Sequence, residues 1–415
     1  MVLLSHPTGN ANVREALLAL YERDMLAAFY TTVAWRERNM WDKMLPANLC
    51  KELSRRSYPG IPDRLIHTSP IRELCRVVAS RCGLRSLVAN TNAPLSTAAI
   101  YRHADRLAAH AVLKLAPAAV YAYDGGALET FRVAHRMGVK TIYELPIADA
   151  RHRQEFFRKE MELQPAFAGI LQEARDDAAW LAQKDEELAL ADQVIVPSRY
   201  VQSTLPDDIH EKNVRVISYG APPVPPRQQP RGRRSGKLRV LYVGSLSQRK
   251  GISYLLGAIE KMKTAVELTM VGSRVGRCAP LDAALQKYNW IPSVPHSSVL
   301  EIMDRHDVLL LPTLSEGFAL VTLEAMSRGM VVVTTPNSGA EGTIRNGIDG
   351  FIVPIRSSDA LAEKLERLAA DRGLLEVMSA SALHRAGECG WEIYRASLAE
   401  SVREVVQTGE ACRCV

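Results

Sequence analysis

The sequence predicts an α/β protein built from two doubly wound, Rossmann-like domains. Its 415 residues are enough for two domains with a core each. Short apolar runs that end at Gly or Pro alternate with stretches of helical periodicity, which is typical of parallel sheets covered by helices. Five prolines between residues 219 and 236 interrupt this alternation, and such a density cannot enter a sheet or a helix interior. We therefore predict an N-terminal domain (1–218), a linker (219–236), a C-terminal domain (237–390) and a terminal helix with a tail (391–415).

The composition is that of an ordinary soluble protein, with 47% apolar and 24% charged residues. No run of apolar residues is long enough to predict a membrane-spanning helix. The first five residues are too short and too weakly charged for a signal peptide. The seven cysteines are scattered, so we expect reduced thiols and a cytoplasmic protein.

The net charge of +6 is unevenly distributed, because residues 1–120 hold sixteen Lys and Arg against nine Asp and Glu. A basic face there would suit anionic lipid headgroups at the inner side of a membrane, or an acidic acceptor. A solvated surface explains the same charges equally well. Nucleic acid is not expected, because the basic residues are not interleaved with aromatic ones and no binding motif occurs.

The N-terminal domain opens with a strand over residues 2–4, a Gly-containing turn and a helix from about Asn12. Ligands bind at the carboxyl ends of such strands, so Gly9 and Asn10 in the first loop are candidate ligand contacts. A tight turn without any ligand explains them nearly as well. Further strands are predicted at 29–33, 118–123, 140–145, 194–198 and 214–218.

The C-terminal domain begins with a predicted strand over 238–243 that ends at Gly244. Arg249 and Lys250 then precede a helix with apolar residues at i, i+3, i+4 and i+7. Two cations at the start of a helix suit a phosphate better than they suit a merely exposed helix start, clearly so for Lys250 and by a small margin for Arg249. The turn after the next strand lacks the middle glycine of a dinucleotide motif, so NAD is not expected.

Residues 309–329 are the most informative stretch of the chain. A buried strand closed by Pro312 leads into a loop with Glu316 and then into a helix over 320–328. The free N–H groups and the dipole of that helix favour an anion such as a diphosphate. Glu316 ahead of the helix and Glu324 about one turn inside it can accept hydrogen bonds from sugar hydroxyls. The arrangement suits a nucleotide-sugar, whereas two incidental surface glutamates are the alternative.

This stretch resembles the E-x7-E signature of retaining glycosyltransferases of family 4, which have the two-domain GT-B fold. Glu316 and Glu324 occupy the two Glu positions, and Lys250 matches the diphosphate-binding Lys of the family's G-R-L-x-x-x-K-G loop. Ser245 stands where that loop has Arg, so one phosphate partner is missing and Arg249 is the candidate replacement. Many members also have a His two residues after the Glu at position 144, where this chain has Pro146. Glu144 or His152 is the suggested substitute.

The resemblance implies two domains that face a central cleft, with the terminal helix crossing back to the N-terminal domain. Residues 35–101 would supply acceptor-facing helices and loops. Glu316 would take the hydroxyls of the transferred sugar, Glu324 the ribose, and Lys250 the diphosphate; Glu316 and Lys250 are the implied catalytic residues. The implied donor-binding residues are Gly9, Asn10, Gly244, Ser245, Arg249, Lys250, Ile291, Val294, Glu316, Gly317, Phe318, Ala319, Leu320 and Glu324.

The implied reaction moves a sugar, with retention, from a nucleotide-diphosphate-sugar to a hydroxyl acceptor, such as a lipid-linked or oligosaccharide acceptor of cell-surface polysaccharide synthesis. No cofactor or metal is expected, because the sequence offers no convincing D-x-D site. A nucleotide-sugar epimerase or a phosphorylase on the same fold is the first alternative. A non-catalytic two-domain binding protein is the second, and the carboxylates and cations placed for a nucleotide-sugar argue against it.

Overall fold

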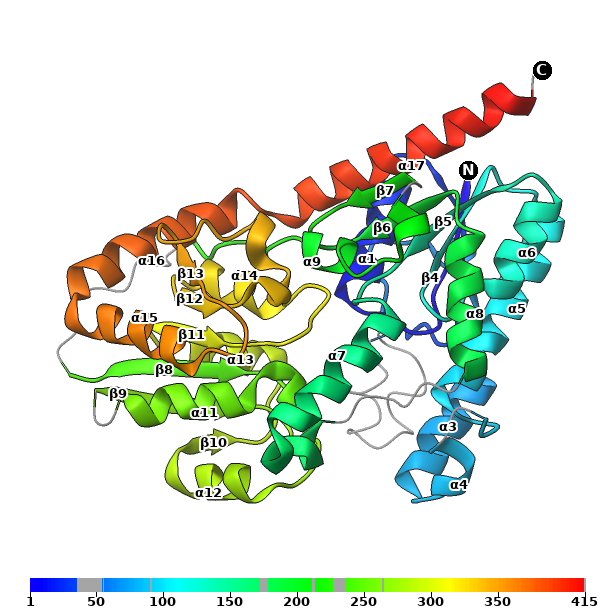
Figure 1. The fold of residues 1–415 in the computed structure, drawn as a ribbon. Coiled ribbons are helices and arrows are strands. Elements are labelled where there is room, and N and C mark those ends of the chain that lie inside the picture. The colour runs from blue at the N-terminus through cyan, green and yellow to red at the C-terminus, as the bar shows by residue number, and fades with distance from the viewer. Residues whose placement is uncertain are drawn as a thin grey trace.

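The computed structural model describes residues 1–35, 54, 56–89, 92–171, 178–210, 213–226, 236–262 and 265–413. Two parallel sheets, one in each half of the chain, are covered by helices (Figure 1). The α/β doubly wound fold predicted from the sequence is thereby confirmed. Within residues 35–101 the structure shows β3, α3, α4 and the start of α5 (bounds below), while 36–53, 55 and 90–91 lie outside the described residues.

The N-terminal sheet has seven parallel strands in the order β3-β2-β1-β4-β5-β6-β7. The strands are β1 (Val2–Ser5), β2 (Leu26–Thr31), β3 (Ile66–Thr68), β4 (Ala119–Tyr123), β5 (Lys140–Glu144), β6 (Gln193–Val196) and β7 (Asn213–Val216). The helical segments are α1 (Ala11–Tyr21), η2 (Asp63–Leu65), α3 (Ile71–Arg81), α4 (Arg85–Val88), α5 (Thr97–Leu115), α6 (Leu128–Arg136), α7 (Ala150–Leu163), η3 (Pro165–Ile170), α8 (Ala178–Ala189), α9 (Arg199–Gln202) and α10 (Asp207–His210).

Strand β1 shows why the sheet is covered on both faces. Every residue of it is buried, and it pairs with β2 on one side and β4 on the other. Leu3 packs into one apolar cluster while Val2 and Leu4 pack into another, because successive side chains of a strand point to opposite faces. A continuous apolar run is what such a strand requires.

The C-terminal sheet has six parallel strands in the order β10-β9-β8-β11-β12-β13. The strands are β8 (Leu238–Val243), β9 (Val266–Val271), β10 (Asn289–Ile291), β11 (Val308–Leu311), β12 (Val331–Thr334) and β13 (Gly350–Ile352). The helical segments are η4 (Gln248–Lys250), α11 (Ile252–Lys261), α12 (Ala279–Lys287), α13 (His296–Met303), α14 (Leu320–Ser327), η5 (Pro336–Ser338), η6 (Ala340–Gly342), α15 (Ser358–Ala370), α16 (Arg372–Gly387) and α17 (Trp391–Arg413).

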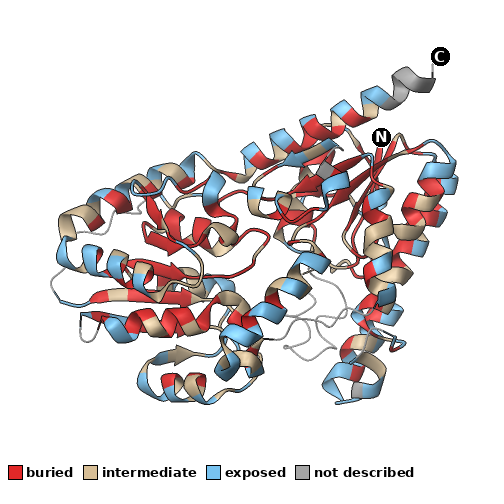
Figure 2. Cartoon of the chain, viewed as in Figure 1, coloured by how far each residue is buried: buried red, intermediate tan, exposed pale blue. Residues whose placement is uncertain are grey.

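The last helix, α17, crosses from the C-terminal half of the molecule to the N-terminal sheet, where it packs on α1 (Figure 1). Tyr394, Leu398 and Val402 on α17 are buried in the same cluster as Val13 and Leu17 of α1. Figure 2 shows the buried residues of α17 on the side that faces the N-terminal sheet. One apolar core therefore spans both halves of the chain. Among the described residues, no helix has both the length and the apolar character needed to cross a bilayer.

A second connection between the halves is built around Glu160 on α7, whose side chain is fully buried. Gln248 Nε2 and the Tyr254 hydroxyl donate to Glu160 Oε1 at 2.8 and 2.9 Å. Arg356 Nε donates to Oε2 at 2.7 Å, and the guanidinium lies 4.5 Å from the centre of the Phe156 ring. All three donors come from the C-terminal half, so a single carboxylate of α7 holds η4, α11 and the segment after β13 together.

We predict that Glu160→Ala lowers the free energy of unfolding by about 3 kcal/mol, because it leaves Arg356 without its buried counter-charge. Urea unfolding followed by circular dichroism measures the change. Glu155→Ala is the matched control, since Glu155 lies on the same helix in an exposed ion pair with Arg158 and should leave stability nearly unchanged. Equal unfolding curves for the two variants would contradict the prediction.

Candidate functional site

Two glycines place Lys250 at the carboxyl edge of the C-terminal sheet. Gly251 has φ +76°, and a Cβ there would lie 1.9 Å from the Pro312 carbonyl oxygen, so only glycine allows η4 to approach β11 this closely. Gly244 has φ +150°, and its position leaves room for the Lys250 side chain, whose Cε lies 3.4 Å from a Cβ built on Gly244. The close approach of η4 to β11 thus places Lys250 at the end of that strand.

Glu316 meets both cations of this loop. Lys250 Nζ lies 2.6 Å from Glu316 Oε1, and Arg249 Nη1 donates to the same oxygen. Arg249 Nη1 also donates to the Ser315 carbonyl oxygen at 3.0 Å. The side chains of Glu316 and Lys250 are each 13% exposed and that of Arg249 is 25% exposed, so the cluster is shielded but open to solvent. Two cations against one carboxylate leave it with a net positive charge.

The loop from Pro312 to Ala319 is fixed by backbone hydrogen bonds from two sides of its own domain. Leu314 N donates to the Arg249 carbonyl oxygen at 2.9 Å, which joins it to η4. Glu316 N donates to the Asn337 carbonyl oxygen at 2.9 Å and Ala319 N to that of Ser338 at 2.8 Å, which joins it to η5. The position of Glu316 is therefore set by backbone groups before any ligand binds.

The N-terminal domain packs directly on this loop. A Cβ on Gly317 would lie 1.6 Å from the Pro146 carbonyl oxygen, so the two backbones are in contact. Ser198 Oγ donates to the Gly317 carbonyl oxygen at 2.7 Å, and the Tyr200 hydroxyl donates to Ser315 Oγ at 2.9 Å. The Glu316–Lys250 cluster consequently lies at the junction of the two domains.

Helix α14 follows the loop and carries the second predicted glutamate. No side chain caps its start at Ala319. Glu324 is half-buried, and its Oε1 lies 2.9 Å from Nε2 of His296, the first residue of α13. The hydrogen bond with Glu324 raises the pKa of His296. The sequence reasoning missed His296; its only signal was the position of this residue just after the strand end expected near the nucleotide base.

The other predicted donor contacts make local interactions. Asn10 caps α1 by accepting a 3.1 Å hydrogen bond from Val13 N, and a Cβ on Gly9 would lie 2.6 Å from the Tyr58 hydroxyl. Ile291 ends β10, and its carbonyl oxygen accepts from Gly272 N at 2.9 Å. Ile291 and Val294 are partly buried against the apolar core. Phe318 is buried with its ring centre 5.6 Å from that of Tyr219.

Ser245 is fixed by its neighbour Tyr242. The Tyr242 hydroxyl donates to the Ser245 carbonyl oxygen at 2.6 Å. Burial, and then the Glu316 carboxylate, raise the pKa of Tyr242, so this phenol stays protonated and keeps its donor role. Arg249, four positions along from Ser245, is the residue that reaches Glu316 beside Lys250.

The suggestion that Glu144 replaces the missing histidine does not fit the structure. Glu144 is buried and accepts hydrogen bonds from Asn12 Nδ2 and from the hydroxyls of Tyr121 and Tyr219. Burial raises its pKa. Because its oxygens are engaged below the surface, Glu144 contributes to the core near α17 rather than to a ligand site. His152, on α7, lies against the rings of Phe156 and Tyr200.

His6, which sequence reasoning did not single out, lies in the loop after β1. Burial lowers the pKa of His6 to about 3, so its ring is neutral at physiological pH. Its Nδ1 accepts a 3.0 Å hydrogen bond from Thr8 N, and its ring packs edge-on against Tyr123. The residue shapes the first loop and adds no charge to the domain junction.

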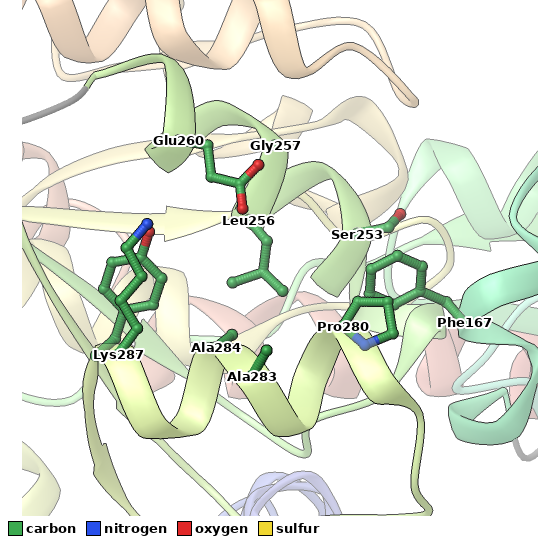
Figure 3. A pocket seen from close by; sticks show the side chains of 10 residues that line it. Phe167, Ser253, Leu256, Gly257, Glu260, Pro280, Ala283, Ala284 and Lys287 are labelled. Atoms are coloured by element: carbon green, nitrogen blue, oxygen red, sulfur yellow. The ribbon is translucent and has the colours of Figure 1, made fainter.

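A cavity of about 350 Å³ lies between α11 and α12, with Phe167 of η3 at one end (Figure 3). Its lining includes Leu256, Ala284 and Lys287 but none of the predicted site residues. Ser253, also in the lining, accepts a hydrogen bond from Gln248, so the cavity wall joins the Glu160 connection. Among the described residues, no group of three His, Cys, Asp or Glu is placed to hold a metal ion.

Comparison with solved structures identifies the fold. Sucrose-phosphate synthase from Thermosynechococcus elongatus aligns with a TM-score of 0.65 at 16% identity, over 98% of this chain and 99% of that one. The Anabaena protein HepE in complex with UDP aligns with a TM-score of 0.58 at 14% identity, over 97% and 99% of the two chains. The GT-B fold implied by the sequence resemblance is therefore confirmed.

The sequence comparisons find similarity to one family over part of the chain. Residues 226–385 match the model of the glycosyl transferases group 1. A D-inositol 3-phosphate glycosyltransferase of Streptomyces bingchenggensis is 28% identical over 174 residues, which are 40% of this chain and 38% of that protein. The capsular polysaccharide biosynthesis glycosyltransferase CapM of Staphylococcus aureus is 31% identical over 144 residues, which are 33% of this chain and 38% of that protein. The matched segments thus span less than half of these curated relatives.

We predict that Glu316→Gln strengthens the binding of inorganic pyrophosphate several-fold, because Arg249 and Lys250 then lose the carboxylate that competes with an anion for them. Lys250→Ala should weaken the same binding by about 1–3 kcal/mol, the usual cost of a charged hydrogen bond. Isothermal titration calorimetry measures both changes. Lys261→Ala, at the other end of α11, is the control and should bind like the wild type. Weaker binding by Glu316→Gln would show that the cluster does not receive the anion.

Proposed function

We propose that this protein is a retaining glycosyltransferase that moves a sugar from a nucleotide-diphosphate-sugar to a hydroxyl acceptor. The observation that carries the proposal is the convergence of Glu316, Arg249 and Lys250 at the junction of the two domains. The match of residues 226–385 to the model of the glycosyl transferases group 1 supports it. Solved GT-B neighbours in complex with UDP and UDP-glucose support the nucleotide-sugar donor.

In this proposal the donor diphosphate replaces Glu316 as the partner of Lys250 and Arg249. Arg249 supplies the cation that Ser245 cannot, because its guanidinium already reaches the carboxylate beside Lys250. Phosphate oxygens carry more charge and more acceptor sites than one carboxylate, so the exchange is favourable. The uncapped start of α14 adds N–H donors and the positive end of its dipole.

Release of Glu316 from the two cations frees its oxygens for the hydroxyls of the donor sugar. Glu324, farther along α14, would accept from the ribose hydroxyls, with His296 as its neighbour. Ile291 and Val294 at the end of β10 would lie against the base, and Gly244, Gly317, Ala319 and Leu320 would supply backbone around the phosphates. Gly9 and Asn10, in the first loop of the N-terminal domain, would close the donor site from the other side.

The chemical step would break the bond between the sugar's anomeric carbon and the diphosphate oxygen. The acceptor oxygen forms its bond on the same face, and its proton passes to the departing diphosphate. Negative charge develops on the departing diphosphate, and its stabilisation is the main electrostatic requirement of the reaction. Lys250, Arg249 and the α14 dipole are placed to stabilise it. We therefore propose catalysis without a metal or cofactor and without a covalent sugar–enzyme intermediate, with Glu316 and Lys250 as the catalytic residues.

For the acceptor and the product we propose only a chemical class. The described part of residues 35–101 would face a lipid-linked or oligosaccharide acceptor, and the product would belong to a cell-surface polysaccharide or glycoconjugate. The relative named for capsular polysaccharide biosynthesis supports this class of product. A cytoplasmic location, with contact at the inner face of a membrane, remains the prediction made from the sequence.

A thermal-shift panel of nucleoside diphosphates and their sugars tests the function first, because the true donor should stabilise the chain most. Release of nucleoside diphosphate from that donor is then followed with and without hydroxyl acceptors. We expect release to depend on an acceptor and the product to keep the donor's anomeric configuration. Conversion of the donor to an isomer without acceptor would show an epimerase instead, and turnover with inorganic phosphate alone a phosphorylase.

We predict that Glu324→Ala weakens the binding of a nucleoside diphosphate by about 1–3 kcal/mol, because the ribose loses a charged hydrogen-bond acceptor. The binding of inorganic pyrophosphate, which has no ribose, should not change. His296→Ala is the paired variant, and it should bind the nucleoside diphosphate at least as well as the wild type, since it frees Glu324. If Glu324→Ala weakened the binding of the nucleoside diphosphate and of pyrophosphate equally, Glu324 would not contact the ribose.

A further inference from the structure

Helices α7 and η3 form an arm of the N-terminal domain (residues 150–170) that packs into the other domain. Ile170, at the end of η3, is fully buried in an apolar cluster whose other buried members, among the described residues, all belong to the C-terminal domain. A Cβ on Gly169 would lie 2.3 Å from the Arg277 carbonyl oxygen, so these two backbones are in contact. Figure 1 shows α7 running from the N-terminal half toward α11 and α12. The arm is therefore packed as part of the C-terminal domain.

The arm presents the carboxylate of Glu160 to Gln248, the first residue of η4. Gln248 is only 1% exposed, and its side chain makes three hydrogen bonds. Its Nε2 donates to Glu160 Oε1 at 2.8 Å and to Ser253 Oγ at 2.6 Å, and its Oε1 accepts from Ser253 N at 3.1 Å. Ser253 N lies in the first turn of α11, where backbone N–H groups have no partner within the helix. One amide thus joins the arm to the start of α11.

The chemistry of these partners sets the orientation of the Gln248 amide. A backbone N–H can only donate, so Ser253 N must face the amide oxygen. A carboxylate accepts, so Glu160 must face the amide nitrogen. An amide turned by 180° would lose both bonds at once. The buried Gln248 side chain is therefore held in one orientation by groups from two different segments.

Gln248 directly precedes the two cations of the candidate site. Successive residues of a 3₁₀ helix turn by about 120°, so neighbouring side chains of η4 point in different directions. Gln248 points to the arm, whereas Arg249 and Lys250 reach Glu316. The end of η4 is held by the contact of Gly251 with the backbone before the loop 312–319. The start of η4 is held by the side chain of Gln248.

We propose that Gln248 is a positioning residue of the diphosphate site. Oriented by Glu160, it holds η4 where Arg249 and Lys250 reach one ligand together. The inference rests on the proposed function, because it takes the donor diphosphate as the ligand of these two cations. It goes beyond that function in making an arm of one domain part of the anion site of the other. Charged hydrogen bonds weaken steeply with distance and angle, so a displaced η4 would bind an anion less tightly.

A helix cap alone accounts for only part of this arrangement. The bonds to Ser253 would be enough to cap α11, and they need no partner on α7. The remaining bond, from Gln248 Nε2 to Glu160, is the one that joins η4 to the arm. Variants that keep the cap and change this bond therefore separate the two roles.

Binding of inorganic pyrophosphate to the full chain, measured by isothermal titration calorimetry, tests the proposal. Gln248→Ala should weaken binding roughly tenfold or more, because both cations lose their common support. Tyr254→Phe is the matched control, since the Tyr254 hydroxyl donates to the same oxygen of Glu160 at 2.9 Å but from α11. It should lower the thermal stability and leave pyrophosphate affinity within about twofold of the wild type.

A charge swap separates positioning from capping. Gln248→Glu keeps an acceptor for Ser253 N but places a second carboxylate against Glu160, so pyrophosphate binding should fall as it does in Gln248→Ala. Combining it with Glu160→Gln restores an amide opposite a carboxylate, with the net charge of the wild type. The double variant should therefore recover most of the lost affinity.

Thermal melts followed by circular dichroism establish that each variant is folded, and the charge swap decides the question if Gln248→Ala does not fold. Wild-type affinity in Gln248→Ala would overturn the positioning role and leave the proposed function standing. Equal losses in Gln248→Ala and Tyr254→Phe would overturn it too, as would a double variant without recovery. A wild type that does not bind pyrophosphate would overturn the diphosphate site itself and this inference with it.

Discussion

The contact of the loop 312–319 with backbone on both of its sides is the constraint on which the site depends. On one side Gly251 lies against Pro312, and on the other Gly317 lies against Pro146. Neither approach leaves room for a side chain, so both positions require glycine. The loop that carries Arg249 and Lys250, the glutamate that faces it and the opposing domain therefore pack as one unit, so a movement of one of them displaces the others.

Electrostatics gives this unit a defined resting state. Without a ligand, Glu316 neutralises one of the two cations that an anion would need, while Glu160 ties the same segment, η4, to α7 of the N-terminal domain. In the second connection the Glu160 carboxylate is fully buried and accepts from three donors, whereas the Glu316 carboxylate keeps some exposure to solvent. Glu160 thus serves as structure, and Glu316 is the carboxylate that we propose exchanges its partners for a ligand. The difference follows from desolvation, which penalises the loss of a buried counter-charge far more.

Much of the fold was predictable because it rests on local patterns. Apolar runs such as Val308–Leu311, closed by Gly or Pro, indicated the strands, and the spacing of Glu316 and Glu324 indicated the candidate site. What the sequence could not predict was pairing between distant segments. His296 beside Glu324, Glu160 among donors of the other domain, and Glu144 enclosed by tyrosines all depend on tertiary packing, which leaves no periodic signal in the chain. The burial of Glu73 on α3 is a similar case, since apolar periodicity does not predict its ion pairs with Arg56 and Arg76.

The path of α17 has a consequence for biogenesis. Tyr394, Leu398 and Val402 complete the apolar core around α1, although nearly the whole chain separates them in sequence. During translation the N-terminal domain therefore emerges before the helix that packs on α1, because α17 follows the C-terminal sheet in the chain. Until α17 emerges, the nascent chain exposes the part of α1 that α17 covers, which is the condition under which chaperones bind and truncated products aggregate.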